Sequence, residues 1–465
     1  MTAASTSILM KVCVAFVTAS LCVPAAGCHR RTQGLPNVLL ISIDTLRADH
    51  LSCYGYARET SPHLDAFAQD AALFENAYAQ APFTLTSHMS IFTSLFPASH
   101  GVNEGRKLSG RVPLLTEVLK DAGYATLGFY SGYWLDPTYG FARGFDRYER
   151  HHGGEEAREK TVSVLAEMAG TDRPFFLFFH LMDVHSGPLE KKGQPLYNTP
   201  PEYRDFFLPH PELDTTRYLS RHIYEDRIVL TEKERANVVA QYDGGILYAD
   251  WIVGQLLQKT KELGLYEPML IVVTSDHGES LGDHGTFKGH GLLWENGLRV
   301  PLLVKLPNHH ARRVQWQGKR LRYRVQLLDI APTILSVAHL DVPASVQGRS
   351  LLTAGDRVVL AQRVRRKPGG SALVDGRYKL VGGGSKWSLF DLVADPGEVH
   401  SLHAERPNLV RMMQGKLRAL SRELRNTRDL LAQDESDTSV TIDQDTHEKL
   451  RALGYLEQPE QGKRN

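Results

Sequence analysis

The stretch Asn37–Ile43 reads NVLLISI and is followed directly by Asp44. Its apolar residues are nearly continuous, and valine, leucine and isoleucine supply all of them. Such a run is typical of a strand that is buried on both faces, as in a parallel sheet that is covered by helices. The stretch therefore predicts an α/β fold in which Asp44 stands at the carboxyl end of a buried strand.

The same kind of run recurs along the chain and alternates with segments of helical periodicity. Further strands are predicted at Ala125–Tyr130, Phe175–Leu181, Met269–Thr274 and Pro301–Lys305. Helices are predicted at Thr60–Gln69, Leu114–Ala122 and Ala236–Leu263. This alternation is typical of an α/β protein with one large, mostly parallel central sheet flanked by helices, which is the fold class that we expect.

The sequence changes character after about Leu352. ALVDGRYKLVGG and KWSLFDLVADPGE indicate short antiparallel strands joined by turns, and Pro407–Leu431 has the periodicity of an amphipathic helix. A polar linker and a short helix over 446–453 are predicted to end the chain. We therefore predict a large domain over residues 36–352 and a smaller C-terminal α+β subdomain with a tail over residues 353–465.

The first residues form a segment of their own. A lysine follows MTAASTSILM, the run VCVAFVTASLCV is apolar, and PAAG places small residues directly before Cys28. This layout is typical of a secretory signal, and the apolar run is short for a membrane span. We expect a lipoprotein-type signal peptide over residues 1–27 and a lipidated Cys28 as the first mature residue, which makes that lipid the only contact with a membrane. The chain would then be exported, either to a bacterial periplasm or as a membrane-anchored lipoprotein; plain secretion with cleavage nearby is the alternative.

The composition argues against a nucleic-acid partner. The chain has 465 residues, a formal net charge of +1 at pH 7 and 42% hydrophobic residues, which is ordinary for a globular protein with a large core. Its basic tract Arg363–Lys367 (RVRRK) is short and is interpreted as a solvated loop. Once the signal has left and Cys28 is acylated, Cys53 remains alone, so that we expect neither an intrachain disulfide nor a cysteine-pair metal site.

Chemically active side chains follow three of the predicted strands at the point where each strand ends. They are Asp44, Asp183, His185, Asp276 and His277. Because ligands of such sheets bind beyond the carboxyl ends of the strands, these side chains mark a candidate site. The two carboxylates of Asp44 and Asp276 with the imidazole of His277 suit one divalent cation, Mn²⁺, Zn²⁺ or Mg²⁺, or Ca²⁺ despite the nitrogen ligand. Taken singly, Asp44 is also a good helix N-cap, and the DHG sequence is also a good turn.

One segment carries more hydroxyl side chains than a core segment needs. Ala81–Gly101 reads APFTLTSHMSIFTSLFPASHG and gathers Thr84, Thr86, Ser87 and His88 between two prolines. Leucine or valine would be usual there if the segment only filled the core. Capping of a helix by these hydroxyl groups is one interpretation, and a reactive hydroxyl that meets the residues at the strand ends is the other.

Several long motifs then occur in order along the chain. They are NVLLISIDTLRADHLSCYGY, TSPHLDAFAQDAALFENAYAQAP, GFARGFDRYE, VVTSDHGESLGDHG, WENGLRVPLLVKLP and LLDIAPTILSVAHLDVP. With these motifs the chain resembles the sulfatase family of the alkaline-phosphatase superfamily, from about Pro36 to its end. The resemblance implies the sulfatase-like α/β fold and a metal-dependent hydrolase of sulfuric or phosphoric esters. It also implies that Asp44, Asp276 and His277 hold the metal, with a nucleophilic oxygen as a further ligand.

The resemblance assigns that nucleophilic oxygen to the hydroxyl-rich segment. In sulfatases it belongs to formylglycine, which is made from Cys or Ser at the start of a C/S-x-P-S-R motif, and the aligned residues here run from Thr84 to His88. Thr84 would be both nucleophile and metal ligand, at the start of a helix that we expect near Ser87. His185 would protonate the leaving oxygen. The remaining roles, contacts to the non-bridging oxygens of the substrate, fall on His88, His290 and Lys288.

This sequence also departs from the family pattern. Thr84 cannot become formylglycine, because oxidation of a secondary alcohol gives a ketone. Thr86 replaces the proline and His88 the arginine of the motif, and Gly128–Trp134 stands in place of the family's Gly-Lys-Trp-His motif. An aldehyde hydrate expels sulfate with its second hydroxyl, which threonine lacks, whereas phosphorus accepts a second attack. The departures therefore favour cleavage of phosphate mono- or diesters with Thr84 as nucleophile.

Three alternatives remain at this stage. Asp183, His185 and His290 are alternative ligands for a second cation. The chain could instead transfer a phospho-head group onto a lipid or glycan, or it could be a non-catalytic relative that binds a polysaccharide. The substrate that we expect is a small-molecule, glycan or lipid ester.

Overall fold

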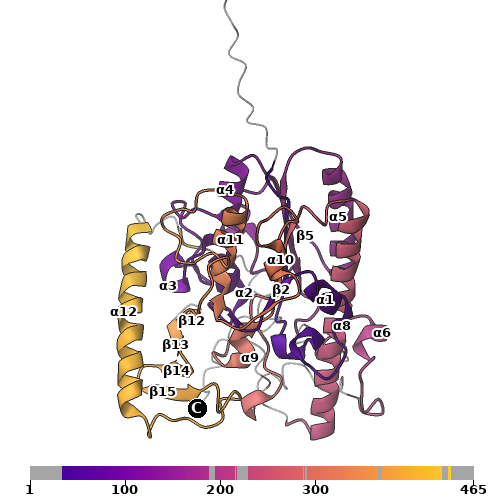
Figure 1. The fold of residues 1–465 in the computed structure, drawn as a ribbon. Helices are drawn as coiled ribbons and strands as arrows, with labels where there is room; N and C mark the ends of the chain where they lie inside the picture. Colours follow the sequence, from indigo (N-terminus) through magenta and orange to yellow (C-terminus); the bar gives the residue numbers. More distant parts are fainter. Residues whose placement is uncertain are drawn as a thin grey trace, which may run out of the picture. The chain divides into compact units, whose positions relative to one another are not determined.

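The central sheet is built around β1 (Val38–Ile43), whose residues are all buried. Eight strands pair in the order β10-β2-β9-β7-β1-β6-β4-β5, and β9 is the strand of this sheet that runs antiparallel to its neighbours. Figure 1 labels β2 and β5 of this sheet among the surrounding helices. The other strands are β2 (Ala72–Phe74), β4 (Ala125–Tyr130), β5 (Arg147–Arg150), β6 (Phe175–Leu181), β7 (Leu270–Thr274), β9 (Leu302–Lys305) and β10 (Arg320–Leu321). The predicted α/β class with a large, mostly parallel sheet is confirmed.

Helices cover both faces of this sheet because the central strands are apolar on both sides. In β1, Leu39 and Ile41 belong to one core, while Val38 and Leu40 belong to the other. The first core is closed by α1 (Pro62–Ala68), α5 (Gly154–Ala169) and α8 (Glu232–Glu262). The second core is closed by α2 (Thr84–Thr93), α4 (Leu115–Asp121) and α11 (Ile330–Val337). Both layers keep water away from the sheet, so the strand ends are the accessible part of it.

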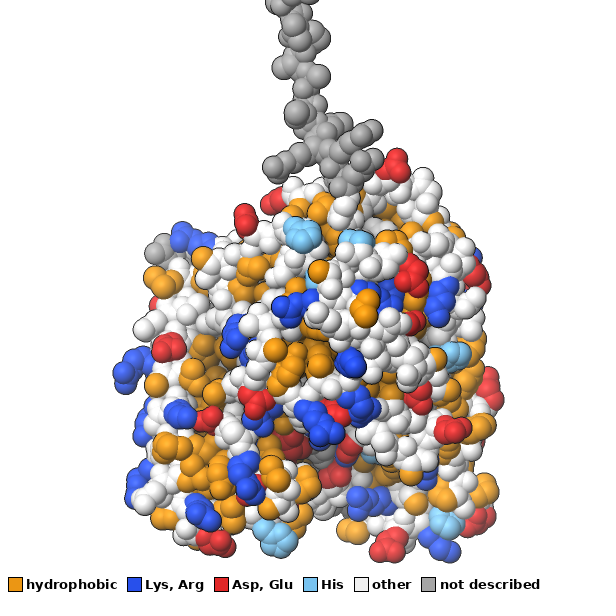
Figure 2. Space-filling view, viewed as in Figure 1, with side chains coloured by type: hydrophobic (Ala, Val, Ile, Leu, Met, Phe, Trp, Pro, Cys, Tyr) orange, Lys and Arg blue, Asp and Glu red, His pale blue; other side chains and the backbone are white. Residues whose placement is uncertain are grey.

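The structure describes residues 34–187, 194–214, 216, 229–285, 287, 291–364, 368–431 and 438–440. The predicted signal peptide over residues 1–27, Cys28 and the predicted helix over 446–453 lie outside these residues. None of the described helices is long and apolar enough to cross a membrane. On the face drawn in Figure 2, Lys and Arg side chains are scattered among acidic and neutral ones, so that this face has no extended field of one sign.

The remaining described strands form two smaller sheets. A three-stranded sheet has the order β11-β3-β8, and a four-stranded antiparallel sheet has the order β12-β13-β14-β15. Their strands are β3 (Ala77–Tyr78), β8 (Arg299–Val300), β11 (Val325–Gln326), β12 (Val359–Val364), β13 (Pro368–Asp375), β14 (Tyr378–Gly383) and β15 (Lys386–Asp391). The remaining short helices are α3 (Pro97–His100), α6 (Pro201–Arg204), α9 (Glu295–Leu298) and α10 (Arg313–Trp316).

The C-terminal part contains an antiparallel sheet and a long helix, as predicted. Helix α12 (Pro407–Leu431) has the predicted bounds and packs Met413 and Leu417 against Leu380 and Leu389 of the four-stranded sheet. This part belongs to the same compact unit as the central sheet, since the described residues from Gly34 onward form one unit. The predicted boundary near residue 352 is therefore a division within that unit.

Two segments differ from the prediction, and a local sequence signal explains the first of them. Helix α8 begins at Glu232, before the predicted Ala236, because Thr231 is its N-cap and forms a capping box with Glu234. The segment Glu155–Thr161, where we predicted no helix, lies inside α5.

A largely buried ionic cluster joins the C-terminal sheet to α9 and to β3 of the three-stranded sheet. Lys379 of β14 is fully buried, and its Nζ lies 3.0 Å from Glu295 Oε1 and 2.8 Å from Glu398 Oε1. Tyr78 donates a hydrogen bond of 2.9 Å to Glu295 Oε2, and the backbone N–H of Glu295 donates one of 2.6 Å to Glu398 Oε2. The charge of Lys379 thus balances the charges of two carboxylates, Glu295 on α9 and Glu398 in the C-terminal part.

We expect Lys379→Met to destabilise the protein by about 3–5 kcal/mol, because it leaves the buried Glu398 and the partly buried Glu295 without a counter-charge. The measurement is chemical denaturation of the purified chain at pH 8, where unpaired carboxylates stay ionised. As a control, Lys259→Met removes an exposed ion pair with Glu262 on α8 and should change the stability by less than about 1 kcal/mol. Equal effects of the two substitutions would contradict the assigned role of Lys379.

Candidate active site

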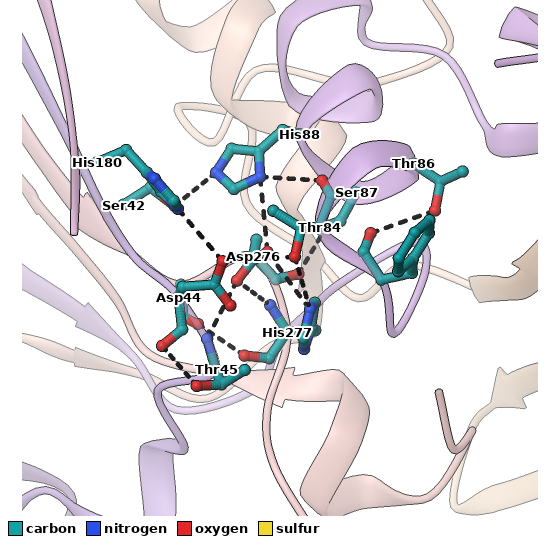
Figure 3. Close-up of polar contacts among 12 residues, drawn as sticks. Ser42, Asp44, Thr45, Thr84, Thr86, Ser87, His88, His180, Asp276 and His277 are labelled. Carbon is teal, nitrogen blue, oxygen red and sulfur yellow. Dashed lines mark hydrogen bonds and ion pairs between the residues drawn. The ribbon is translucent and has the colours of Figure 1, made fainter. Parts of the chain in front are cut away.

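The hydroxyl-rich segment begins α2, and the helix starts at Thr84, before the predicted Ser87. Phe83 is the N-cap residue and offers no side-chain cap, and every residue of α2 is buried. Thr84 Oγ1 lies 3.4 Å from Asp44 Oδ2 and 3.3 Å from His277 Nε2 (Figure 3). Its hydroxyl therefore faces the residues at the strand ends and does not cap its own helix.

The predicted metal ligands come together at the ends of β1 and β7, which are neighbours in the sheet. Asp44, Asp276 and His277 are fully buried, and one ligand atom from each lies within 4.8 Å of the others. Among the described residues, neither Asp44 Oδ1 nor Asp276 Oδ2 receives a hydrogen bond. Buried carboxylate oxygens are rarely left in this way unless an ion completes them, so the donor set fits a divalent cation.

The orientation of His277 agrees with this use. Its Nδ1 lies 2.9 Å from the carbonyl oxygen of Gly278, which can only accept a hydrogen bond. Nδ1 therefore carries the proton, and the lone pair of Nε2 points toward Thr84 and the two carboxylates. This is the tautomer that a metal-binding imidazole needs.

Backbone contacts hold the second carboxylate in place. Asp276 Oδ1 accepts hydrogen bonds from the backbone N–H of His277 at 2.9 Å and of Thr45 at 3.3 Å. Thr45 has a positive φ of 56°, an uncommon conformation for a β-branched residue, and it turns the chain sharply after Asp44. Ser87 Oγ donates a hydrogen bond of 2.6 Å to the carbonyl oxygen of Asp276. The start of α2 is thereby fixed to the end of β7.

Burial and neighbouring charges separate the acidities of the two carboxylates. Burial would raise the pKa of Asp44, but the imidazoles around it, above all His180, outweigh burial and hold its pKa well below the usual range. Burial, together with the charge of Asp44, raises the pKa of Asp276 from 3.8 to about 6. Above pH 6 the cluster therefore carries two negative charges in a buried position, which favours a cation between them.

His185 lies after β6, close enough to Asp44 for their charges to interact. Its Nδ1 is 2.6 Å from the carbonyl oxygen of Ser186, so that Nδ1 carries the proton and Nε2 of the neutral ring is an acceptor. Burial lowers the pKa of His185, and the charge of Asp44 opposes that shift. The neutral ring is thus suited to accept a proton, and a protonated ring is suited to donate one.

A search of known families then decides the class of protein. The family model described as Sulfatase matches residues 36–340. The chain belongs to the sulfatase family. It is 27% identical over 386 residues to an arylsulfatase of Clostridium perfringens, with 68% of this chain and 77% of the relative covered. It is 24% identical over 416 residues to an ulvan-active sulfatase of Formosa agariphila, with 79% of this chain and 77% of the relative covered.

Solved structures show the same fold. The phosphonate monoester hydrolase of Agrobacterium radiobacter aligns with a TM-score of 0.67 and 20% identity, covering 88% of this chain and all (100%) of that one. The predicted sulfatase-like fold and the prediction of a sulfatase-family ester hydrolase are therefore confirmed. Sulfatase-family enzymes use a divalent metal ion, and the group of Asp44, Asp276 and His277 fits one.

In this sulfatase, His88 occupies the position of the motif's arginine. It is fully buried, its Nδ1 donates to the carbonyl oxygen of Thr84 at 3.0 Å, and its Nε2 accepts from Ser42 Oγ at 2.9 Å. Both ring nitrogens are thus engaged by the chain itself. This arrangement favours a positioning role for His88 over the predicted contact with the substrate.

His180 is the residue near the site that sequence reasoning missed, because it stands inside the apolar predicted strand Phe175–Leu181, where a histidine passes for a core residue. Its Nδ1 accepts from the backbone N–H of Ser131 at 3.3 Å, so that Nε2 carries the proton. That Nε2 lies 3.4 Å from Asp44 Oδ2, and the ring makes an edge contact with His88 at 5.0 Å between centroids. His180 therefore orients the Asp44 carboxylate. Its alternation with Phe179 and Leu181 on β6 is the sequence signal that places it on the same face as the helix α2 core.

Of the remaining predicted residues, only Asp183 is described, and it lies outside the metal group. Lys288 and His290 lie outside the described residues. Asp183 Oδ1 accepts a hydrogen bond of 3.2 Å from the backbone N–H of Gly154, at the start of α5. Within the described part of the chain, Asp44, Asp276 and His277 form the one group that fits a metal, so a second ion at Asp183 finds no support there.

The segment that stands in place of the lysine motif has an apolar role. Trp134 is buried, and its ring contacts that of Phe83 at 5.0 Å between centroids in an edge-on arrangement. Because Phe83 directly precedes Thr84, this contact helps to fix the start of α2. The segment Gly128–Trp134 thus supplies packing at a place where the family motif supplies a cation.

Proposed function

We propose that this sulfatase-family enzyme cleaves phosphate mono- or diesters with Thr84 as the nucleophile, and that one divalent cation (Mn²⁺, Zn²⁺, Ca²⁺ or Mg²⁺) is bound by Asp44, Asp276 and His277. The position of Thr84 Oγ1, 3.4 Å from Asp44 Oδ2 and 3.3 Å from His277 Nε2, is the observation that carries the proposal. A threonine at this place offers an oxygen nucleophile that cannot be converted to an aldehyde hydrate.

The surroundings of Thr84 support attack by its hydroxyl. A divalent cation at this site, when bound, supplies positive charge that lowers the pKa of a nearby hydroxyl and neutralises ester oxygens. Thr84 is the first residue of the ten-residue helix α2, whose N-terminus favours an anion in front of it. The hydrogen bonds of His88 and Ser87 fix this helix end, so the hydroxyl is held in one orientation before the substrate arrives.

The reaction has two displacements at the same atom. In the first, Thr84 releases its hydroxyl proton to solvent and its Oγ forms a bond to phosphorus, the bond to the leaving oxygen breaks, and protonated His185 donates a proton to that oxygen. In the second, water attacks phosphorus, the bond to Thr84 Oγ breaks, and neutral His185 accepts the proton of water. Nε2 of the neutral ring is an acceptor, which suits the second step. The single hydroxyl of threonine limits breakdown to such an attack, and phosphorus permits it.

Hydrolysis of a sulfate ester is the second candidate, because the family and its relatives are sulfatases. The substrate that we propose is a small-molecule, glycan or lipid ester, and the ulvan-active sulfatase is a relative with a glycan substrate. A lipid at Cys28 would hold the enzyme at a membrane in the periplasm. The intact metal group argues against the polysaccharide-binding alternative, since binding alone does not require it. Transfer of a phospho-head group differs from hydrolysis only in the acceptor of the second step.

The test is turnover by the purified chain, with aryl phosphate, an aryl phosphodiester and aryl sulfate as matched substrates and with Mn²⁺ or Zn²⁺ added. We expect kcat/KM for a phosphorus ester to exceed that for the sulfate by about tenfold or more, a difference of about 1.4 kcal/mol in transition-state binding. Turnover of aryl sulfate alone would overturn the proposal and favour the second candidate.

A further inference from the structure

Arg47 stands three residues after Asp44 in the loop that follows β1, and its side chain is only 6% exposed. Its Nε and Nη2 donate hydrogen bonds of 2.9 and 2.7 Å to the two carboxylate oxygens of Asp49 in the same loop. Its Nη1 donates to Asp283 Oδ2 at 2.6 Å and to the carbonyl oxygen of Glu279 at 3.2 Å, both in the loop that follows β7. One guanidinium group thus joins the two loops that carry the metal group.

The backbone from which this side chain extends is fixed on α8. Tyr242 of α8 is fully buried, and its hydroxyl accepts a hydrogen bond of 2.9 Å from the backbone N–H of Arg47. The same hydroxyl donates one of 2.8 Å to the carbonyl oxygen of Thr45. The chain that follows Asp44 is therefore held against α8 at two points, and the guanidinium group extends from a fixed base.

The loop after β7 packs closely against the stem of this arginine. Gly278 directly follows His277, and a Cβ at Gly278 would come within 3.3 Å of Arg47 Cγ and within 1.9 Å of the carbonyl oxygen of Asn296. Only a residue without a side chain fits between these atoms. The stem of Arg47 thus lies against the backbone next to the imidazole ligand, while its charged end binds farther along the same loop.

Arg47 can influence the cation only through these loops. Among the described residues, its guanidinium group makes no hydrogen bond to any member of the metal group. The backbone N–H of Thr45 also donates across the two loops, to Asp276 Oδ1 at 3.3 Å. The backbone N–H of Leu46 donates to Ser275 Oγ at 3.0 Å. The ion pair of Arg47 with the second loop is shorter than either bond, and both of its partners are charged, which makes it the strongest of these links.

We propose that Arg47 is a positioning residue for the metal group. It sets the distance between the carboxylate at the end of β1 and the two ligands at the end of β7, and it thereby increases the affinity of the site for the divalent cation. Two of these ligands are carboxylates, which repel each other before the cation arrives. A charged link that already holds the loops together lowers the free-energy cost of forming the site. The inference rests on the proposed cation and is independent of the proposed reaction.

The experiment measures the binding of Mn²⁺ to the full chain, after a chelator has removed other metal, by titration calorimetry. The electron paramagnetic resonance spectrum of the bound Mn²⁺ reports the geometry of its ligands. Arg47→Lys keeps the positive charge but loses the planar fork that reaches both loops, and we expect it to raise Kd about tenfold and to change the spectrum. Asp283→Ala removes the acceptor in the second loop and should raise Kd by a similar factor.

Two control variants separate positioning from a loss of charge and from a loss of stability. Asp49→Ala also removes a carboxylate partner of Arg47, but within the same loop, and should raise Kd by less than about threefold. Arg357→Lys weakens another buried arginine–aspartate pair, with Asp329, which belongs to neither loop. It should lower the melting temperature and leave Kd unchanged.

Melting temperatures in chelator identify a variant that fails to fold, and Asp283→Ala then decides, because the Asp283 side chain is 31% exposed. A folded Arg47→Lys or Asp283→Ala chain whose Kd stays within about threefold of the wild type would overturn the proposal. The same holds if Asp49→Ala or Arg357→Lys raises Kd as much as these variants do. Binding of Mn²⁺ by a wild type that turns over no phosphorus ester would count against the proposed reaction alone.

Discussion

Thr84→Ala is expected to lower kcat for phosphate esters by at least about 10³-fold, because it removes the only atom that can carry the covalent intermediate. The substitution leaves the metal group untouched, since alanine lacks only the hydroxyl and the side-chain methyl group. Substrate binding and KM should therefore change far less than kcat. The measurement is steady-state turnover of an aryl phosphate or phosphodiester with saturating Mn²⁺ or Zn²⁺.

Thr84→Ser is the matched control, because serine restores the hydroxyl at the same backbone position and should keep a substantial part of the activity. Mass spectrometry after rapid quenching provides a second readout: a phosphate adduct should lie on the peptide that contains Thr84, and it should be absent in Thr84→Ala. Turnover of sulfate esters alone, at a rate that Thr84→Ala leaves unchanged, would contradict the assignment of the nucleophile.

The fold and the metal group were readable from the sequence for one physical reason. A strand buried on both faces, such as Asn37–Ile43, has to be apolar at almost every position, so a polar residue directly after it marks the strand end. Parallel strands place these ends at one edge, and Asp44 therefore meets Asp276 and His277 although more than two hundred residues separate them. The resemblance to sulfatases added Thr84, whose position next to them no local pattern could supply.

Other features depend on contacts that a one-dimensional pattern does not contain. His180 is one residue among the apolar residues of β6, and its role follows only from the distance between its Nε2 and Asp44. The alignment with the family motif led us to expect the start of α2 near Ser87, but the helix begins at Thr84, and the hydroxyl of Ser87 donates to the carbonyl oxygen of Asp276. Tertiary contacts thus decided both the helix start and the direction of the side chains.

Tertiary contacts also decide the roles of His88 and His180, the two histidines near the nucleophile. The motif's arginine would place a permanent charge beside Thr84, whereas His88 is neutral in its surroundings, since burial lowers its pKa to about 3. The rings of His88 and His180 meet edge to face, and both are held by hydrogen bonds. Together they fill the space between α2 and β6. Among the described residues, a cation held by Asp44, Asp276 and His277 would then be the main permanent positive charge at the reacting centre, so we expect the activity to depend strongly on that cation.

Asp44→Asn is accordingly expected to abolish the stabilisation that Mn²⁺ or Zn²⁺ gives to the intact chain. At a free cation concentration of one hundred times Kd, binding to the folded state stabilises it by about 2.7 kcal/mol, and chelation removes this amount. Without the cation, the two buried carboxylates repel each other at pH 7.5, because the pKa of Asp276 is about 6 and that of Asp44 is lower. Asp44→Asn removes one of these charges but keeps an oxygen for His180. Because the imidazoles around Asp44 favour its ionised form, the metal-free variant also loses that stabilisation, and the expected signature of the variant is the missing response to the cation.

Melting temperatures at pH 7.5, with chelator and with each cation, test this expectation. The cation should raise the melting temperature of the wild type and leave that of Asp44→Asn unchanged. Asp250→Asn is the matched control, because Asp250 is a buried carboxylate on α8 that accepts backbone hydrogen bonds from His63 and Leu64, away from the metal group. It should lower the melting temperature under both conditions and keep the difference between them. A cation-dependent rise in Asp44→Asn equal to that of the wild type would mean that the cation binds elsewhere, and Thr84 would then lose the charge on which its reactivity depends.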